Sequence, residues 1–99
     1  MRAQKLQEER NERNSIAAQI GALLRSRPGS QISLRERAAW FERKAELFGQ
    51  LAEHYGPIDP QEAAECRYLS TIAAEEGARL RSVSRHPAGR TRLRAAEVA

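Results

Sequence analysis

Six side chains in this sequence have the chemistry to form a metal site or an acid–base pair. They are two histidines, a cysteine and three neighbouring acids, namely His54, His86, Cys66, Asp59, Glu62 and Glu65. Metal sites generally use ligands that recur at short, regular separations, and the sequence contains no Cys-x-x-Cys or His-x-x-x-His pair. We therefore predict no metal site, no cofactor and no catalytic residue.

Each of these side chains also has a structural explanation. His54 stands where a helix should end and can interact with the helix dipole, and Asp59 and Glu62 fit a helix cap. A free cysteine such as Cys66 usually behaves as a small buried apolar group. The glycines are scattered and form no phosphate-binding loop. These features predict that the protein is not an enzyme.

Positive charge is concentrated at the C-terminal end. Residues 1–78 hold 11 basic and 12 acidic side chains, whereas residues 79–99 hold six arginines and a single glutamate. Guanidinium groups contact phosphates in any nucleic-acid sequence. The candidate nucleic-acid contacts are therefore Arg79, Arg81, Arg85, Arg90, Arg92 and Arg94.

A fourteen-residue segment, 72–85, partly resembles the helix-turn-helix family of bacterial DNA-binding proteins. The matching features are Ile72-Ala73, Gly77 four residues later at the turn, and Val83 followed by a serine and an arginine. The resemblance implies a recognition helix that would present four side chains to DNA: Arg79, Arg81, Ser82 and Arg85. A continuous helix through Gly77 explains the same residues, because one glycine costs a helix only about 1 kcal/mol.

The composition predicts an all-α protein. The chain has 99 residues, which fit one domain, and helix-forming Ala, Glu, Arg, Gln and Leu predominate. The single cysteine and the charged N-terminal run favour a cytoplasmic protein, and no segment has the roughly 20 consecutive apolar residues of a membrane span. Heavy use of alanine and arginine is compatible with a GC-rich bacterial genome.

The first expected helix covers residues 3–26 and ends before Pro28-Gly29-Ser30. Its second half carries one apolar face, whereas residues 1–14 have few apolar groups and are expected to project or fray. The apolar face consists of Ile16, Ile20, Leu23 and Leu24.

The second expected helix covers residues 33–55 and opens with Ser33 and Glu36, a capping box. One coiled-coil seam runs along it at steps of four and three: Leu34, Ala38, Phe41, Ala45, Phe48, Ala52 and Tyr55. A second apolar row lies beside the seam and consists of Trp40, Leu47 and Leu51. One neighbouring helix would not cover both rows, so we expect the second row to be a self-association surface.

The third expected helix covers residues 60–84, after a connection in which Gly56 can adopt the left-handed conformation of a helix end and Asp59 can cap the next helix. Glu76 falls inside its apolar face and should find a basic partner, for which Arg37 and Lys44 are the candidates.

The short connection predicts that helices 33–55 and 60–84 form an antiparallel hairpin, which helix 3–26 closes into a three-helix arrangement. Residues 1–86 then form one domain, and residues 87–99 form a flexible basic tail. We expect a non-enzymatic adaptor or regulator that self-associates through helix 33–55, with a dimer favoured and a further protein partner left open. The alternative is a small DNA-binding or DNA-associated regulator that uses residues 79–94.

Overall fold

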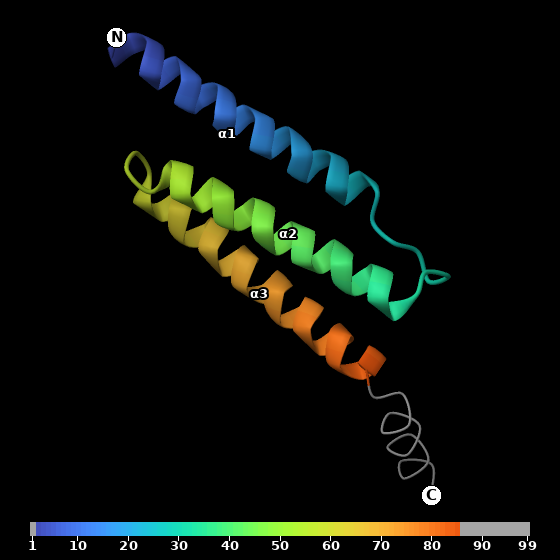
Figure 1. Cartoon of the computed structure of the whole chain (residues 1–99). Coiled ribbons are helices and arrows are strands. Elements are labelled where there is room, and N and C mark those ends of the chain that lie inside the picture. The colour runs from blue at the N-terminus through green and yellow to red at the C-terminus, as the bar shows by residue number, and fades with distance from the viewer. Residues whose placement is uncertain (1, 86–99) are drawn as a thin grey trace, which may run out of the picture.

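The computed structural model describes residues 2–85 of the chain, and within them the regular secondary structure is entirely α-helical (Figure 1). These helices are α1 (Arg2–Arg25), α2 (Leu34–Tyr55) and α3 (Pro60–Arg85). The all-α prediction is confirmed, and each expected helix is found within one residue of its predicted bounds. Met1, His86 and the predicted tail lie outside the described residues. The same holds for three of the candidate nucleic-acid contacts: Arg90, Arg92 and Arg94.

The beginnings of α2 and α3 are set by the predicted caps. The Ser33 hydroxyl accepts a hydrogen bond from the Glu36 N–H at 3.1 Å, and the Asp59 carboxylate accepts one from the Glu62 N–H at 3.1 Å. Both bonds satisfy N–H groups that have no partner within the first helical turn. The side chains of Ser33 and Asp59 thus determine where α2 and α3 begin.

The end of α2 differs from the prediction. Gly56 has φ −44° and ψ −50°, so it remains right-handed, and its N–H donates to the Ala52 carbonyl at 2.9 Å. The left-handed glycine cap expected here was therefore wrong. Pro57 follows immediately and lacks the N–H that another helical turn would need, which accounts for the end of the helix.

The helices α2 and α3 run in opposite directions along their full lengths and approach closely (Figure 1). Small residues make this approach possible, because alanine and glycine leave little side chain between the two backbones. Ser70 strengthens the contact by donating to the Ala45 carbonyl at 2.7 Å. The fully or almost fully buried small residues are Ala38, Ala52, Ala63, Ala73 and Gly77.

On its other side α2 packs against α1, so that α2 lies between the two other helices. Ile16 and Ile20 of α1 form a core cluster with Leu47 and Leu51 of α2. The Trp40 indole N–H donates to the Leu23 carbonyl at 3.0 Å, at the C-terminal end of α1. The backbones of α1 and α3 make no comparable approach.

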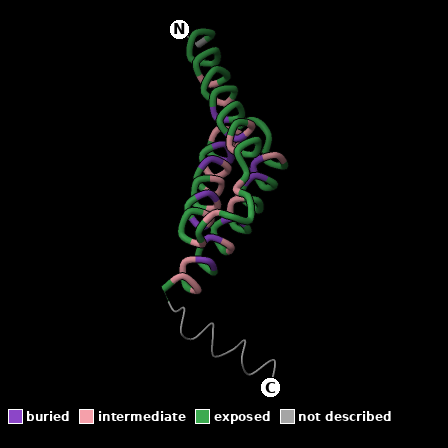
Figure 2. Tube along the Cα trace, turned by 90° about the vertical axis from the view of Figure 1, so that its right-hand side faces the viewer, coloured by how far each residue is buried: buried purple, intermediate pink, exposed green. Residues whose placement is uncertain are grey.

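The first turns of α1 extend beyond the connection between α2 and α3, and they are exposed (Figure 2). Leu6 keeps 54% of its surface accessible there. This follows from the sequence, because residues 2–14 provide almost no apolar groups to bury. The segment is nevertheless helical from Arg2 onward.

Candidate interaction surface

The predicted self-association row is covered within a single chain. Trp40 and Leu51 are each 8% exposed and Leu47 is 1% exposed, because α1 lies across them. The expectation of an open row along α2 is therefore corrected. The prediction underestimated the second half of α1, whose isoleucines fill the space that we assigned to another copy.

Two of the three candidate nucleic-acid contacts within the described residues are engaged in ion pairs. Arg79 donates to the Glu76 carboxylate, with Nε 3.0 Å from Oε2, and Arg81 forms two hydrogen bonds with Glu42 at 2.9 and 2.7 Å. These bonds lower the pKa of both carboxyl groups and raise the pKa of both guanidinium groups. Arg85 is exposed at the end of α3.

The implied helix-turn-helix is wrong, because α3 continues without a break from Pro60 to Arg85. Gly77 is buried against α2, where an added Cβ would lie 3.1 Å from the Glu42 Cγ and 3.4 Å from the Ala38 carbonyl oxygen. The glycine therefore serves close helix packing and does not form a turn. The expected partners of Glu76 were also wrong, since it pairs with Arg79 one turn along its own helix instead of with Arg37 or Lys44.

The candidate chemical residues within the described chain lie in different structural settings. His54 lies 3.3 Å from the Glu12 carboxylate of α1, and Asp59 caps α3. Cys66 is 2% exposed, and burial, followed by the nearby Glu62 and Glu65, raises the pKa of its thiol. Among residues 2–85, no three histidine, cysteine or acidic side chains are grouped so that they could hold a metal ion. No helix of the described chain is long and apolar enough to cross a membrane.

One surface of the α2–α3 pair exposes apolar side chains, and we call it the apolar face: Phe48 and Tyr55 of α2 with Leu69 and Ile72 of α3. The two aromatic residues follow Phe41 at steps of seven and so share one flank of α2. Phe41 and Glu76 line the same cavity, so this flank of α2 lies next to the flank of α3 that carries Glu76. Leu69 and Ile72 share that flank of α3 with Glu76. The aromatic rings are half-buried, whereas Leu69 is 40% and Ile72 45% exposed.

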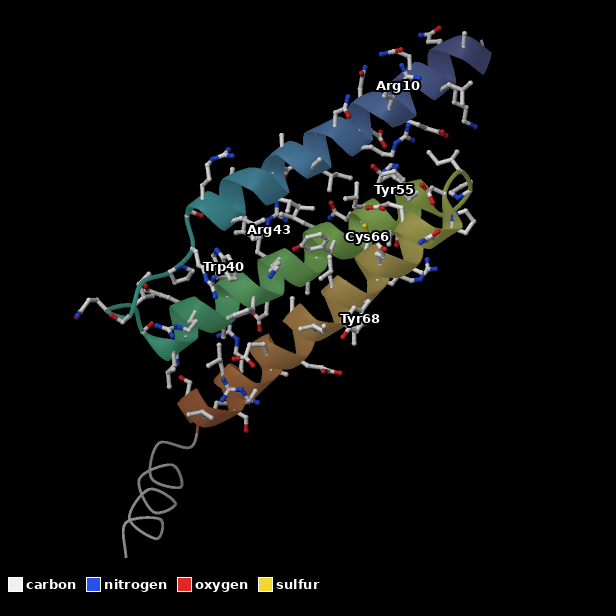
Figure 3. The ribbon with its side chains drawn as sticks, turned by 180° about the vertical axis from the view of Figure 1, so that it is seen from behind. Arg10, Trp40, Arg43, Tyr55, Cys66 and Tyr68 are labelled. Carbon is white, nitrogen blue, oxygen red and sulfur yellow. The ribbon has the colours of Figure 1, made fainter. Side chains whose placement is uncertain are left out.

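The apolar face continues around α3. Tyr68 is 65% exposed and points away from α2 (Figure 3). With Leu69 it lines an open groove of about 440 Å³ along the first half of α3. Exposed apolar groups that adjoin one another in this way more often mark an interface than single exposed residues do.

Charged side chains border the apolar face on both sides. The Arg13 guanidinium lies over the Tyr55 ring at 5.8 Å, and the Lys44 ammonium lies 5.5 Å from the centre of the Trp40 ring. On the α3 side, Glu62 and Glu65 stand in the first turns, at the same end of the pair as Tyr55. The border is thus basic along α1 and α2 and acidic along the start of α3.

The opposite surface of the same two helices is polar, and we call it the polar face. The ion pair between Glu42 and Arg81 lies there and joins α2 to α3. Its other members are exposed and carry charges, amides, hydroxyls or single methyl groups: Glu46, Gln50, Glu53, Arg67, Thr71, Ala74 and Ala78. The α2–α3 pair therefore has one apolar and one polar broad surface.

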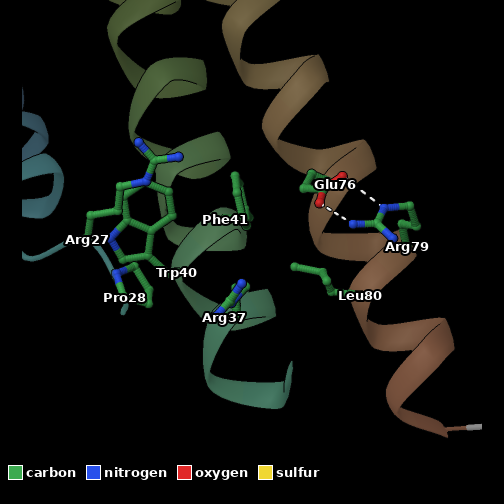
Figure 4. Close-up of a pocket in the computed structure, with 8 residues that line it drawn as sticks. All are labelled: Arg27, Pro28, Arg37, Trp40, Phe41, Glu76, Arg79 and Leu80. Carbon is green, nitrogen blue, oxygen red and sulfur yellow. Dashed lines mark hydrogen bonds and ion pairs between the residues drawn. The ribbon is translucent and has the colours of Figure 1, made fainter. Parts of the chain in front are cut away.

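A cavity of about 290 Å³ opens where the segment that follows α1 meets α2 and α3 (Figure 4). Sequence reasoning did not find it, because its residues come from three separate segments. The only signal was the position of Arg37 close to Trp40 and Phe41 in the first turns of α2. Its lining consists of Arg27, Pro28, Arg37, Trp40, Phe41, Glu76, Arg79 and Leu80.

Comparison of the chain with protein families, with curated proteins and with solved structures finds no match in any of the three.

Proposed function

We propose that the protein is a non-enzymatic helical interaction protein that pairs with a second copy of itself through the apolar face. The observation that carries the proposal is the exposure of Leu69 and Ile72 beside half-buried Phe48 and Tyr55. Burying these groups removes apolar surface from water, at about 25 cal/mol per Å². The proposal keeps α2 as part of the interface but moves the contact from the Trp40 row to the adjoining flank of the helix, which carries Phe48 and Tyr55.

The charges that border the face favour a second copy as the partner. In a symmetric dimer the same patch is used twice, so a basic edge meets the partner's acidic edge. If α3 of each copy lies over α1 and α2 of the other, Glu62 and Glu65 of the second copy approach Arg13. Arg13 and these acids stand at the same end of the molecule, next to Tyr55, so the two edges meet at matching heights.

The first experiment is sedimentation equilibrium of the full chain over a wide concentration range. We expect dimerisation, and we expect Ile72→Glu to weaken it by about tenfold or more, because the substitution places an unpaired charge in the centre of the interface. Ala74→Glu is the matched control, since Ala74 is an exposed residue of the same helix on the polar face. Far-UV circular dichroism should show unchanged helicity for both variants.

A charge exchange tests the pairing itself. Arg13→Glu should weaken dimerisation, and adding Glu65→Arg to the same chain should restore it, because each edge then carries the charge that its partner edge had before. A wild-type chain that stays monomeric at all concentrations, or a dimer that Ile72→Glu does not affect, would refute the proposal.

No contact of the described residues favours the DNA-associated alternative. Arg79 and Arg81 already have carboxylate partners, and the segment that resembled a helix-turn-helix is one helix. Adding a random DNA duplex to the same sedimentation experiment, at low salt, tests that alternative directly, because phosphate binding should give cosedimentation that weakens as salt is raised.

A further inference from the structure

We propose that the cavity between α2, α3 and the segment that follows α1 binds a small organic carboxylate that carries an aromatic ring. The cavity volume of about 290 Å³ is near the lower end of ligand pockets, which range from roughly 300 to 1,000 Å³. Its lining combines the two kinds of group that such a ligand needs. They are guanidinium groups for the carboxylate and apolar side chains for the ring (Figure 4).

The cavity contains more positive than negative charge. Three arginines line it, against one carboxylate, and that carboxylate, Glu76, is held by Arg79. Within residues 2–85, neither Arg27 nor Arg37 takes part in an ion pair. Two guanidinium groups at this concave site therefore have no carboxylate partner within residues 2–85, and a bound anion can pair with them.

Arg37 is held in place with hydrogen-bonding capacity to spare. Its Nη2 donates to the Gly29 carbonyl at 2.9 Å, which ties the side chain to the segment between α1 and α2. Its Nε is buried and has no acceptor in the described chain. Buried donors without acceptors are rare in folded proteins, and a guanidinium with unused N–H groups is the ordinary partner of a planar carboxylate.

The rest of the lining selects a ligand with an apolar body. Pro28, Trp40, Phe41 and Leu80 form the apolar part of the lining, and the Trp40 and Phe41 rings meet edge to face with their centres 5.0 Å apart. A ring that packs against these side chains makes aromatic contacts. An inorganic anion would leave the apolar part uncovered, so the lining favours an aromatic carboxylate over phosphate or sulfate.

Trp40 makes the proposal easy to test, because it is the single tryptophan of the chain and lines the cavity. The experiment is a fluorescence titration of the full protein with phenylacetate, and in parallel with phenylacetamide, which has the same shape without the charge. We expect phenylacetate to change the Trp40 emission saturably. Phenylacetamide should have an affinity at least about tenfold lower, since a hydrogen bond between charged groups contributes more free energy than one to a neutral group.

Variants locate the binding. Arg37→Gln and, separately, Arg27→Gln should each weaken phenylacetate binding by about tenfold, whereas Arg35→Gln should not. Arg35 is the matched control, because it lies on α2, is exposed and does not line the cavity. The Arg27 variant keeps the hydrogen bond from Arg37 to the Gly29 carbonyl. Weaker phenylacetate binding in that variant can therefore not be caused by the loss of this hydrogen bond.

Two results would overturn this proposal: equal binding of phenylacetate and phenylacetamide, or phenylacetate binding that neither arginine variant reduces. The titration is repeated with Ile72→Glu, which disrupts the apolar face and not the cavity. Unchanged phenylacetate binding in that variant separates this proposal from the proposed dimer, so that either can fail alone.

Discussion

The contact between α2 and α3 and the contact between α1 and α2 are built in different ways. The first uses alanines and glycines that bring two backbones close together, with Ala38 and Ala63 fully buried. The second uses a few large side chains, of which Leu47 is 1% exposed, and it is edged by polar contacts such as that between His54 and Glu12.

This difference shows how stability is distributed. The α2–α3 contact runs along both helices, so its many small contacts share the burial. The α1 contact depends on the second half of that helix, while the first half is exposed. Segments with few buried apolar contacts open at a lower free energy than the rest of a domain, and we therefore expect α1 to open first.

The largest effect should come from Leu47→Ala, which removes the largest fully buried side chain from the cluster that holds α1. Leucine-to-alanine substitutions in cores cost about 2–5 kcal/mol, from lost burial and the cavity left behind. Urea unfolding followed by circular dichroism measures the change. Leu24→Ala is the control, because Leu24 is 45% exposed on α1 and should cost far less. Equal losses in the two variants would mean that α1 is not held through Leu47.

The α2–α3 contact is tested by Gly77→Leu. A Cβ at this position would already lie 3.1 Å from Glu42 Cγ, so a full leucine must push the helices apart, at about 1–3 kcal/mol. Ala78→Leu adds the same side chain one residue later, on the exposed polar face, and should leave the free energy of unfolding nearly unchanged. If both variants were equally stable, the close approach at Gly77 would not contribute to the fold.

The sequence predicted the elements better than their arrangement. Ser33 and Asp59 mark helix starts because capping is local, and the hydrogen bonds from Glu36 and Glu62 are those expected. Gly77 was harder to interpret, since a glycine suits both a turn and a close helix contact. Only the neighbouring α2, with Glu42 and Ala38 against it, decides between the two.

The candidate surface shows the same limit. The periodicity of α2 identified two apolar rows but could not tell which neighbour covers each, because that depends on how the eight-residue segment 26–33 places α1 against α2. Trp40 was therefore expected on a surface and is buried instead. The exposure of Leu69 and Ile72 could not be predicted, since both belong to the apolar stripe of their helix and such a stripe ordinarily faces the core.

A smaller effect should follow from Trp40→Phe, which keeps an aromatic ring but removes the indole N–H that bonds to the Leu23 carbonyl. The loss of one such hydrogen bond typically costs about 0.5–1.5 kcal/mol. If α1 is the less strongly held helix, amide hydrogen exchange should accelerate in α1 and change little where α2 meets α3. Uniform acceleration in all three helices would show that α1 does not open separately.

The smallest effect concerns pH and the ion pair that joins α2 to α3 on the polar face. Hydrogen bonds from Arg81 hold the pKa of Glu42 below its ordinary value of 4.5. A carboxyl group with a lowered pKa in the folded state stabilises the protein above its ordinary pKa, and this contribution is lost as the pH falls through the lowered value. Glu42→Gln should therefore reduce the melting temperature slightly at pH 7 and make no difference at a pH well below the lowered pKa.

Glu53→Gln is the control for this measurement, since Glu53 is an exposed residue of α2 that forms no ion pair within residues 2–85. Because Glu42 is solvent-accessible, solvent and salt screen its pair with Arg81, and the difference should shrink further as salt is raised. A pH profile that Glu42→Gln leaves unchanged would mean that the ion pair with Arg81 does not help to hold α2 and α3 together. That outcome would sharpen the contrast with α1, whose contact combines large side chains with polar bonds at its edges.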